Sequence, residues 1–229
     1  MRKNIISFIV FILHIKGLNA QVIPQGFMVA TVESVVIGNQ VWMKNNLNVV
    51  NYRNGDPIPN TSNFSSLTTG AYGEYNNSAA NGAIYGKLYN WYAINDSRGV
   101  CPIGWRVPSH NDFVVLTNFV ATGGASGSSI VNTNNQLVAG GKLKEIGTMH
   151  WQSPNTDATD IYDFNGLPSG WKDGTLFAGI GTHASYWTST VYDLDNTGAF
   201  RFTLYYNKAD LARVWSPKTF GLAVRCIKN

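Results

Sequence analysis

Charged residues are scarce in this chain. They make up 13% of its 229 residues, whereas Gly, Asn, Ser and Thr are abundant. Low charge with many turn-forming residues indicates short strands and long loops and argues against a helical bundle. The net charge of +4 includes Arg2, Lys3 and Lys16 near the N-terminus. The rest of the chain therefore carries only about +1, and a nucleic-acid partner has no support in the composition.

Long apolar runs are also missing. The first apolar stretch covers residues 4–13, follows Arg2 and Lys3, and precedes the small residue Ala20. This order is typical of a secretory signal peptide. The stretch is shorter than the about 20 residues that a membrane-spanning helix needs, and no later segment is apolar enough to span a bilayer. We expect residues 1–20 to be a signal peptide, with a buried N-terminal helix as the alternative.

Removal of this leader leaves about 209 residues, which is enough for one domain with a sizeable core. The sequence shows no internal repeat and no interdomain linker. We therefore expect a lead-in over residues 21–33 and one domain over residues 34–229. The protein would be secreted, to the periplasm, the cell surface or the extracellular space.

Cysteine is the third scarce feature, with Cys101 and Cys226 alone. Neither lies in a CxxC pair and no histidine is near in sequence, which argues against a metal site. An exported chain meets an oxidising compartment, where two thiols tend to close. We expect a Cys101–Cys226 disulfide, with two unpaired buried thiols as the alternative. The closed loop would stabilise the fold by roughly 4 to 5 kcal/mol in the chain-entropy account.

Several strands are predicted, either from apolar residues that alternate with polar ones or from apolar runs on both sides of a turn. Residues 35–43 indicate a hairpin, because apolar runs flank a Gly-Asn turn. Three alternating residues, Phe200, Phe202 and Leu204, predict a strand with one buried face. Further strands are expected over residues 186–190, 212–215 and 222–227, the last with Cys226 on its apolar side.

The clearest helix signal begins at Ser109, an N-cap residue followed three positions later by Asp112. Phe113, Leu116 and Val120 then recur on one face. Residues 85–94 fit either a short amphipathic helix or a pair of strands. Residues 51–82 predict a long irregular loop, and residues 122–136 predict an exposed insertion.

Several motifs, in order, resemble the Fibrobacter succinogenes major paralogous domain over roughly residues 34–228. They are Val36–Met43 with Asn45–Leu47, Tyr52–Pro59, Tyr85–Ala93, Cys101–Ser109, Gly140–Glu145 with His150–Trp151, Gly166–Gly170, Tyr186–Thr190 and Phe220–Cys226.

The resemblance implies an α+β class, a C-type-lectin-like mixed fold with two helices, short antiparallel sheets and neighbouring termini. In that fold the Cys101–Cys226 bridge ties the start of the main helix to the last strand. The family implies no defined activity. It is found on exported proteins of Gram-negative bacteria, with surface or adhesive roles suspected. The fold is also similar to formylglycine-generating enzymes and to receptor proteins diversified by retroelements.

Catalytic motifs find little support. The residue types of a hydrolase triad occur together at Ser109, His110 and Asp112, but the members of a triad come from segments that are distant in sequence. A helix cap explains Ser109 and Asp112. A formylglycine-generating enzyme needs active-site cysteines, and the disulfide leaves none. The remaining histidines His110, His150 and His183 lack zinc-ligand spacing.

Calcium is the one cofactor with a candidate site. Asp193, Asp195 and Asn196 form an oxygen-rich stretch that could hold Ca²⁺. The Pro-containing and Trp-Asn-Asp motifs of lectin-type calcium sites are absent. The alternative is an ordinary Asp/Asn turn between two strands, and we expect no cofactor.

Aromatic residues are abundant and include seven tryptophans. We expect Trp42, Trp91, Trp105 and Trp187 to lie in the core. Exposed Trp and Tyr are good platforms for sugars and protein hot spots. The candidate ligand-binding residues are Trp171, Arg201, Tyr205 and Trp215.

These features favour a non-catalytic, exported binding or adhesion module of the bacterial cell envelope. Its partner would be a glycan or a surface protein. The first alternative is a structural envelope domain without a small-molecule ligand. The second is an enzyme using the C-terminal face. A deep pocket lined by convergent acids would favour the enzyme, and an exposed aromatic patch would favour binding.

Overall fold

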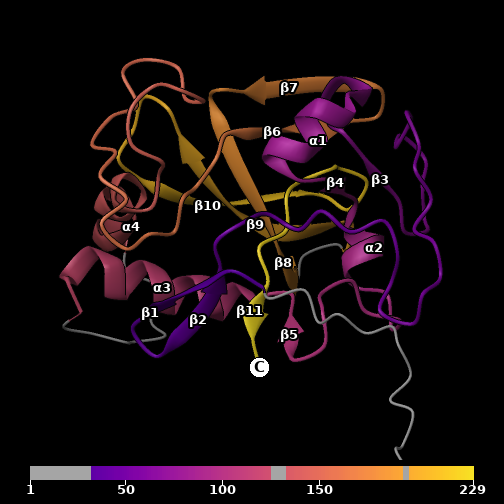
Figure 1. The fold of residues 1–229 in the computed structure, drawn as a ribbon, viewed down its shortest axis with the longest axis horizontal. Coiled ribbons are helices and arrows are strands. Elements are labelled where there is room, and N and C mark those ends of the chain that lie inside the picture. Colours follow the sequence, from indigo (N-terminus) through magenta and orange to yellow (C-terminus); the bar gives the residue numbers. More distant parts are fainter. Residues whose placement is uncertain (1–31, 125–132, 193–195) are drawn as a thin grey trace, which may run out of the picture. The chain divides into compact units, whose positions relative to one another are not determined.

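A computed structural model describes residues 32–124, 133–192 and 196–229 of the protein (Figure 1). The predicted signal peptide over residues 1–20 and most of the lead-in lie outside the described residues. Part of the predicted insertion, residues 125–132, does so as well. In the described ranges, no helix is long and apolar enough to cross a membrane.

The first sheet brings both ends of the domain together. Its order is β1-β2-β11-β5. The strands are β1 (Ser34–Ile37), β2 (Gln40–Met43), β11 (Ile227–Lys228) and β5 (Trp105–Arg106). Strands β1 and β2 form the predicted hairpin, with Gly38 in the turn at φ +64°. Figure 1 shows the short strand β11 next to the C-terminus.

The second sheet has five strands in the order β10-β9-β8-β6-β7. They are β6 (Ser169–Asp173), β7 (Leu176–Ile180), β8 (His183–Val191), β9 (Gly198–Tyr205) and β10 (Leu211–Pro217). The strands predicted over residues 186–190, around Phe200, Phe202 and Leu204, and over residues 212–215 are confirmed as parts of β8, β9 and β10. The β6–β7 hairpin was not predicted, because residues 169–180 are rich in glycine and do not alternate.

The segment over residues 85–94 is neither of the two structures expected. Helix α1 (Ala79–Tyr85) ends there, β4 (Leu88–Tyr89) pairs with β3 (Tyr72–Gly73), and α2 (Trp91–Ile94) follows. The predicted loop over residues 51–82 thus also contains β3, a 3₁₀ turn (Tyr75–Asn77) and most of α1. The apolar spacing of residues 85–94 therefore reflects burial from several sides rather than one helical face.

Helix α3 (His110–Thr122) has Ser109 as its N-cap, as predicted, with a complete capping box to Asp112. A second helix, α4 (Thr133–Ala139), continues into a 3₁₀ turn (Gly140–Lys142). The described residues therefore hold four α-helices, not two. The fold is a mixed α+β structure with few, short helices and mainly antiparallel sheets.

The core consists of two clusters of buried residues. The first packs α3 against the second sheet. The second lies between α2, β4 and the C-terminal segment. The tryptophans predicted for the core, Trp42, Trp91, Trp105 and Trp187, are buried.

The predicted strand over residues 222–227 is wrong in extent. Only its last residue belongs to β11, and all six of its residues are buried. The segment runs between the two sheets and makes isolated bridges from Leu222 to Tyr89 and from Ala223 to Tyr186. Both of its sides therefore face the core. Even Arg225 is fully buried.

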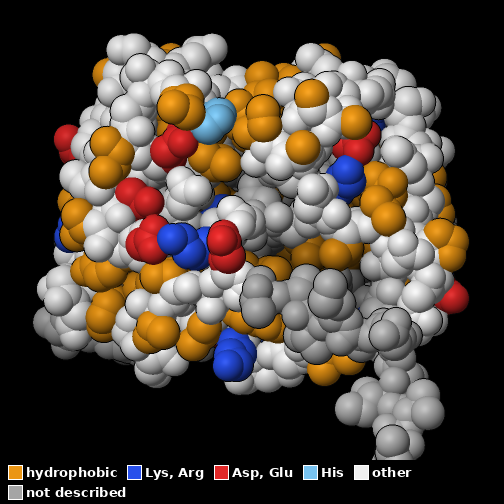
Figure 2. Space-filling view, in the orientation of Figure 1, with side chains coloured by type: hydrophobic (Ala, Val, Ile, Leu, Met, Phe, Trp, Pro, Cys, Tyr) orange, Lys and Arg blue, Asp and Glu red, His pale blue; other side chains and the backbone are white. Residues whose placement is uncertain are grey.

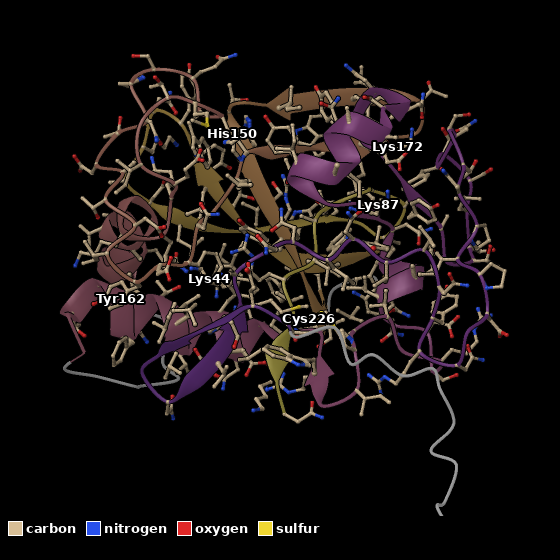
Figure 3. All side chains as sticks on the ribbon, viewed as in Figure 1. Lys44, Lys87, His150, Tyr162, Lys172 and Cys226 are labelled. Carbon is tan, nitrogen blue, oxygen red and sulfur yellow. A yellow bond between two sulfur atoms is a disulfide. The ribbon has the colours of Figure 1, made fainter. Side chains whose placement is uncertain are left out.

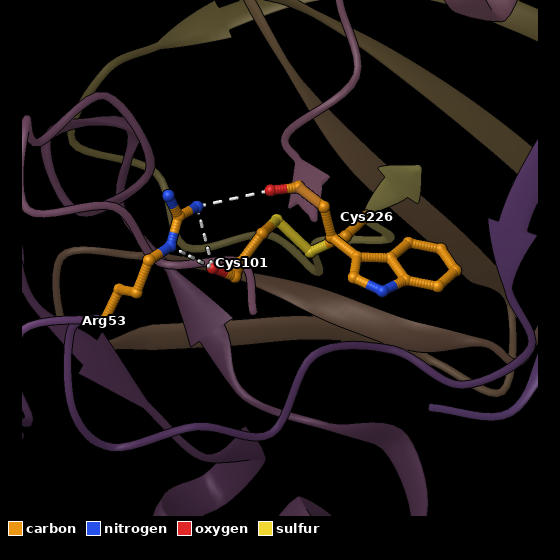
Figure 4. The surroundings of a disulfide bond; sticks show 4 residues. Arg53, Cys101 and Cys226 are labelled. Carbon is orange, nitrogen blue, oxygen red and sulfur yellow. Dashed lines mark hydrogen bonds between the residues drawn. A yellow bond between two sulfur atoms is a disulfide. The ribbon is translucent and has the colours of Figure 1, made fainter. Parts of the chain in front are cut away.

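The predicted disulfide is confirmed. Cys101 and Cys226 are bonded across 125 residues, and both are buried. The Arg53 guanidinium lies beside the bridge (Figure 4), donating to the Cys101 carbonyl at 3.0 and 3.1 Å and to the Trp105 carbonyl at 3.2 Å. The bridge and this side chain together join the loop before α3 to the last strand and to the segment around residue 53.

Candidate functional site

The second sheet presents two faces with different chemistry. On β9, Phe202 points toward α3, where it stacks on Phe113 with ring centroids 4.8 Å apart. Residues Arg201, Thr203 and Tyr205 alternate with this side and point the other way. We call the side against α3 the helix face and the opposite side the outer face.

Three of the four candidate ligand residues meet on the outer face. Tyr205 contacts His183 of β8, with ring centroids 4.9 Å apart. His183 and Trp171 both border Gly179, so closely that a Cβ there would lie 3.0 and 3.2 Å from their atoms. Arg201 Nη1 donates to Ser185 Oγ at 3.2 Å. We call Trp171, His183, Ser185, Arg201 and Tyr205 the outer cluster.

Arg201 is the charged residue of the outer cluster at pH 7. The pKa of His183 is lowered by burial and by the nearby guanidinium, so its imidazole is neutral at pH 7. Its Nδ1 lies 2.8 Å from Thr182 Oγ1. The hydroxyl of Ser185, which accepts from the guanidinium, also lies 3.1 Å from Thr203 Oγ1, and both residues are buried. The cluster thus combines one cation, hydroxyl groups and three aromatic rings.

Trp215, the fourth candidate, lies on the helix face. It pairs across β10–β9 with Phe200, and cross-strand partners share one side of a sheet. It stacks on Tyr192, with centroids 5.8 Å apart and planes 16° apart, and remains 48% exposed. The exposed Arg213 guanidinium lies 5.9 Å from the Phe200 ring. We call Tyr192, Phe200, Arg213 and Trp215 the aromatic platform.

His110, at the start of α3, packs against the aromatic platform. Its ring packs on Phe200 and Phe202, with centroids 4.8 and 5.7 Å apart. Burial and the charge of Arg213 lower its pKa. The imidazole is therefore neutral at pH 7 and costly to protonate in the folded state.

Acid should therefore weaken the fold through His110. A histidine with a depressed folded pKa binds fewer protons folded than unfolded, so its contribution is lost as pH falls below about 6.5. We expect the His110→Gln variant to lose less stability than the wild type between pH 7.5 and pH 5. Urea denaturation at both pH values measures the difference, and equal losses in the two proteins would contradict this assignment.

Two residues of the triad-like motif, Ser109 and Asp112, form a helix cap. Ser109 Oγ accepts from the Asp112 amide, and the Asp112 carboxylate accepts from the Ser109 amide. Arg106 holds the same carboxylate at 2.6 and 2.8 Å. The His110 ring packs into the aromatic platform instead of bonding to Ser109. The three side chains therefore do not form a triad.

Part of the calcium candidate lies outside the described residues, namely Asp193 and Asp195. Asn196 is described and exposed, and its Oδ1 accepts from the Lys218 ammonium at 2.8 Å. An ammonium at this oxygen competes with a bound cation. Within the described ranges, no group of three or more His, Cys, Asp or Glu residues could hold a metal ion.

A cavity of about 320 Å³ lies beside the disulfide. Its lining includes Arg53, Arg106, Ser189 and apolar side chains, and no carboxylate. Both guanidinium groups are already bound, Arg53 by backbone carbonyls and Arg106 by Asp112. The cavity therefore lacks the convergent acids that would suit acid–base catalysis.

The pairing between His150 and Glu145 was not predicted, because no motif in the sequence indicates it. His150 Nδ1 lies 2.8 and 3.0 Å from the two carboxylate oxygens, and its ring meets Tyr85 edge-on at 5.7 Å. Figure 3 labels His150 in the upper part of the view, and Figure 2 shows a histidine there beside an acidic side chain. No serine or cysteine is bonded to this pair among the described side chains.

Comparison with known proteins places the chain in a family. A sequence model described as the Fibrobacter succinogenes major domain matches residues 35–228. Searches of curated proteins and of solved structures gave no match. The matched region spans the hairpin, the disulfide, α3 and both large sheets. The chain therefore belongs to the Fibrobacter succinogenes major domain family.

Proposed function

We propose that this protein is an exported, non-catalytic binding module of the bacterial cell envelope, and that the aromatic platform around Trp215 binds glycans. The observation that carries the proposal is the exposure of Trp215. Five of the seven tryptophans are buried and Trp171 is partly buried, whereas Trp215 is 48% exposed.

The platform has the chemistry that sugars need. A rigid aromatic face packs on the C–H groups of a sugar ring at little entropic cost, because Trp and Tyr have few rotatable bonds. Tyr192 holds Trp215 in place through ring stacking. The exposed Arg213 beside it supplies hydrogen-bond donors for sugar hydroxyls.

Export is supported by two independent features. The N-terminal sequence has the order of a signal peptide. The disulfide uses both cysteines of the chain, as is common in oxidising compartments.

A C-type-lectin-like arrangement is supported by the first sheet. The N-terminal hairpin pairs with the C-terminal strand β11. The disulfide links the loop before the main helix α3 to the residue preceding β11. A non-catalytic role fits the capping function of Ser109 and Asp112 and the lack of a carboxylate in the cavity lining.

A glycan-array screen of the oxidised domain tests this proposal, with and without Ca²⁺. We expect specific binding that the Trp215→Ala variant loses by about tenfold or more, since hot-spot aromatics typically contribute 2 kcal/mol or more. The matched control is Met149→Ala, which removes another exposed apolar side chain, 84% exposed, outside the platform. Binding unchanged in Trp215→Ala would contradict the assignment of the glycan site to the aromatic platform. No binding by the folded protein would favour the structural envelope role instead.

A further inference from the structure

Arg201 in the outer cluster is a cation without a matching acceptor. Its Nε is buried and has no hydrogen-bond partner, and Nη1 reaches only the neutral hydroxyl of Ser185. No ion pair to Arg201 occurs among the described side chains. A guanidinium carries five N–H donors, and leaving a buried one unpaired is costly.

Two fully buried cations of this domain, Lys144 and Arg225, are satisfied by its own atoms. Lys144 donates to three backbone carbonyls, at 2.7, 2.9 and 3.0 Å. Arg225 donates to the carbonyls of Phe164 and Asn165 and to Asn46 Oδ1. Lys144 and Arg225 thus find acceptors for their N–H groups within the fold, whereas Arg201 Nε has none.

Arg201 is partly exposed, so an acceptor from outside the protein can reach the outer part of its guanidinium and not the buried Nε. Trp171 is fixed by stacking on Phe220, with centroids 5.6 Å apart and planes 13° apart. Tyr205 and His183 supply further ring surface, and all three rings are partly exposed. A fixed cation among aromatic faces and hydroxyl groups suits a sugar ring that bears a carboxylate, because guanidinium–carboxylate pairing is bidentate and sugar rings pack on aromatic faces.

We propose that the outer cluster is a second binding site, specific for carboxylate-bearing saccharides, in which Arg201 binds the carboxylate. The site is separate from the aromatic platform, because Arg201 and Trp215 lie on opposite faces of the same sheet. Trp171, Tyr205 and His183 orient the ring. The inference does not depend on glycan binding at Trp215.

Oligogalacturonate is the probe, with its methyl ester and a neutral galactose oligomer as matched ligands. By calorimetric titration we expect the acid to bind at least about tenfold more tightly than the ester, as charge-assisted hydrogen bonds are the strong ones. Arg201→Gln should lose that tenfold preference, and Arg201→Lys should retain part of it. Arg98→Gln removes an exposed arginine outside both proposed sites and should leave acid binding unchanged. Circular dichroism and thermal melting establish that each variant is folded.

Three results would overturn the proposal. They are no binding of oligogalacturonate to folded wild type, equal binding of acid and ester, and full binding by a folded Arg201→Gln variant. Equal affinity for a short peptide with a free C-terminus would overturn the assignment to saccharides. Trp215→Ala should leave oligogalacturonate binding intact, so failure at the platform and failure at the outer cluster are distinguishable.

Discussion

Removing the Cys101–Cys226 bond should lower the free energy of unfolding by roughly 4 to 5 kcal/mol. The bond closes a loop across 125 residues, and such a large loop restricts the unfolded chain strongly. The native contacts around the bridge remain, because Arg53 bonds to the Cys101 carbonyl and Met43 to the Cys226 carbonyl. Breaking the bond therefore lowers stability mainly by raising the conformational entropy of the unfolded chain. It is a large fraction of the roughly 5 to 15 kcal/mol typical of a domain.

Guanidinium denaturation of the wild type and of the Cys101→Ser/Cys226→Ser double variant measures this effect. Wild type held in reductant is the control, because it loses the bond without a change in sequence. Both should show the same reduced midpoint. A loss below about 1 kcal/mol would contradict the chain-entropy account for this fold.

The second large effect is expected at Lys144. Lys144→Met should lower the free energy of unfolding by about 3 kcal/mol, because it removes a fully buried ammonium and its hydrogen bonds to the carbonyls of Thr156, Tyr205 and Lys208. Three carbonyl acceptors use all three ammonium protons. Burial lowers the pKa of Lys144 to about 8, so the ammonium is charged at pH 7, where the measurement belongs.

Lys172→Met is the matched control. Lys172 is also fully buried, but it donates to one carbonyl, that of Ser62, and otherwise lies over the rings of Phe64 and Phe177. Methionine keeps most of that packing, so a loss of about 1 kcal/mol is expected. Equal losses in the two variants would show that the number of carbonyl acceptors does not set the stability contribution.

Local signals in the sequence were the ones that predicted structure correctly. The Gly38 hairpin and the Ser109–Asp112 capping box each depend on residues a few positions apart. The disulfide was predictable because the chain has only two cysteines. The 222–227 segment failed because alternation signals a strand with one exposed side, whereas this segment is enclosed from both sides.

The ligand-binding role of the candidate residues stays a prediction, and their arrangement in space could not be predicted from the sequence. Of the four candidates, Trp171, Arg201 and Tyr205 lie on the outer face and Trp215 lies on the helix face. Which face Trp215 occupies depends on the β9–β10 register, in which it opposes Phe200. That register is set by the turn over residues 206–210 and by packing on α3. The contacts of His183 with Tyr205 and Trp171 likewise join separate strands, so no local spacing predicts them.

The most direct test of the account follows the indole N–H signals of the seven tryptophans by ¹⁵N NMR during titration. Four indoles, those of Trp42, Trp91, Trp151 and Trp187, are hydrogen-bonded in the interior and serve as internal references. A neutral glycan selected on the array should move the Trp215 signal, and oligogalacturonate should move the Trp171 signal. Movement of the interior indoles alone, or no movement with either ligand, would contradict the claim that this domain binds saccharides on two separate faces of one sheet.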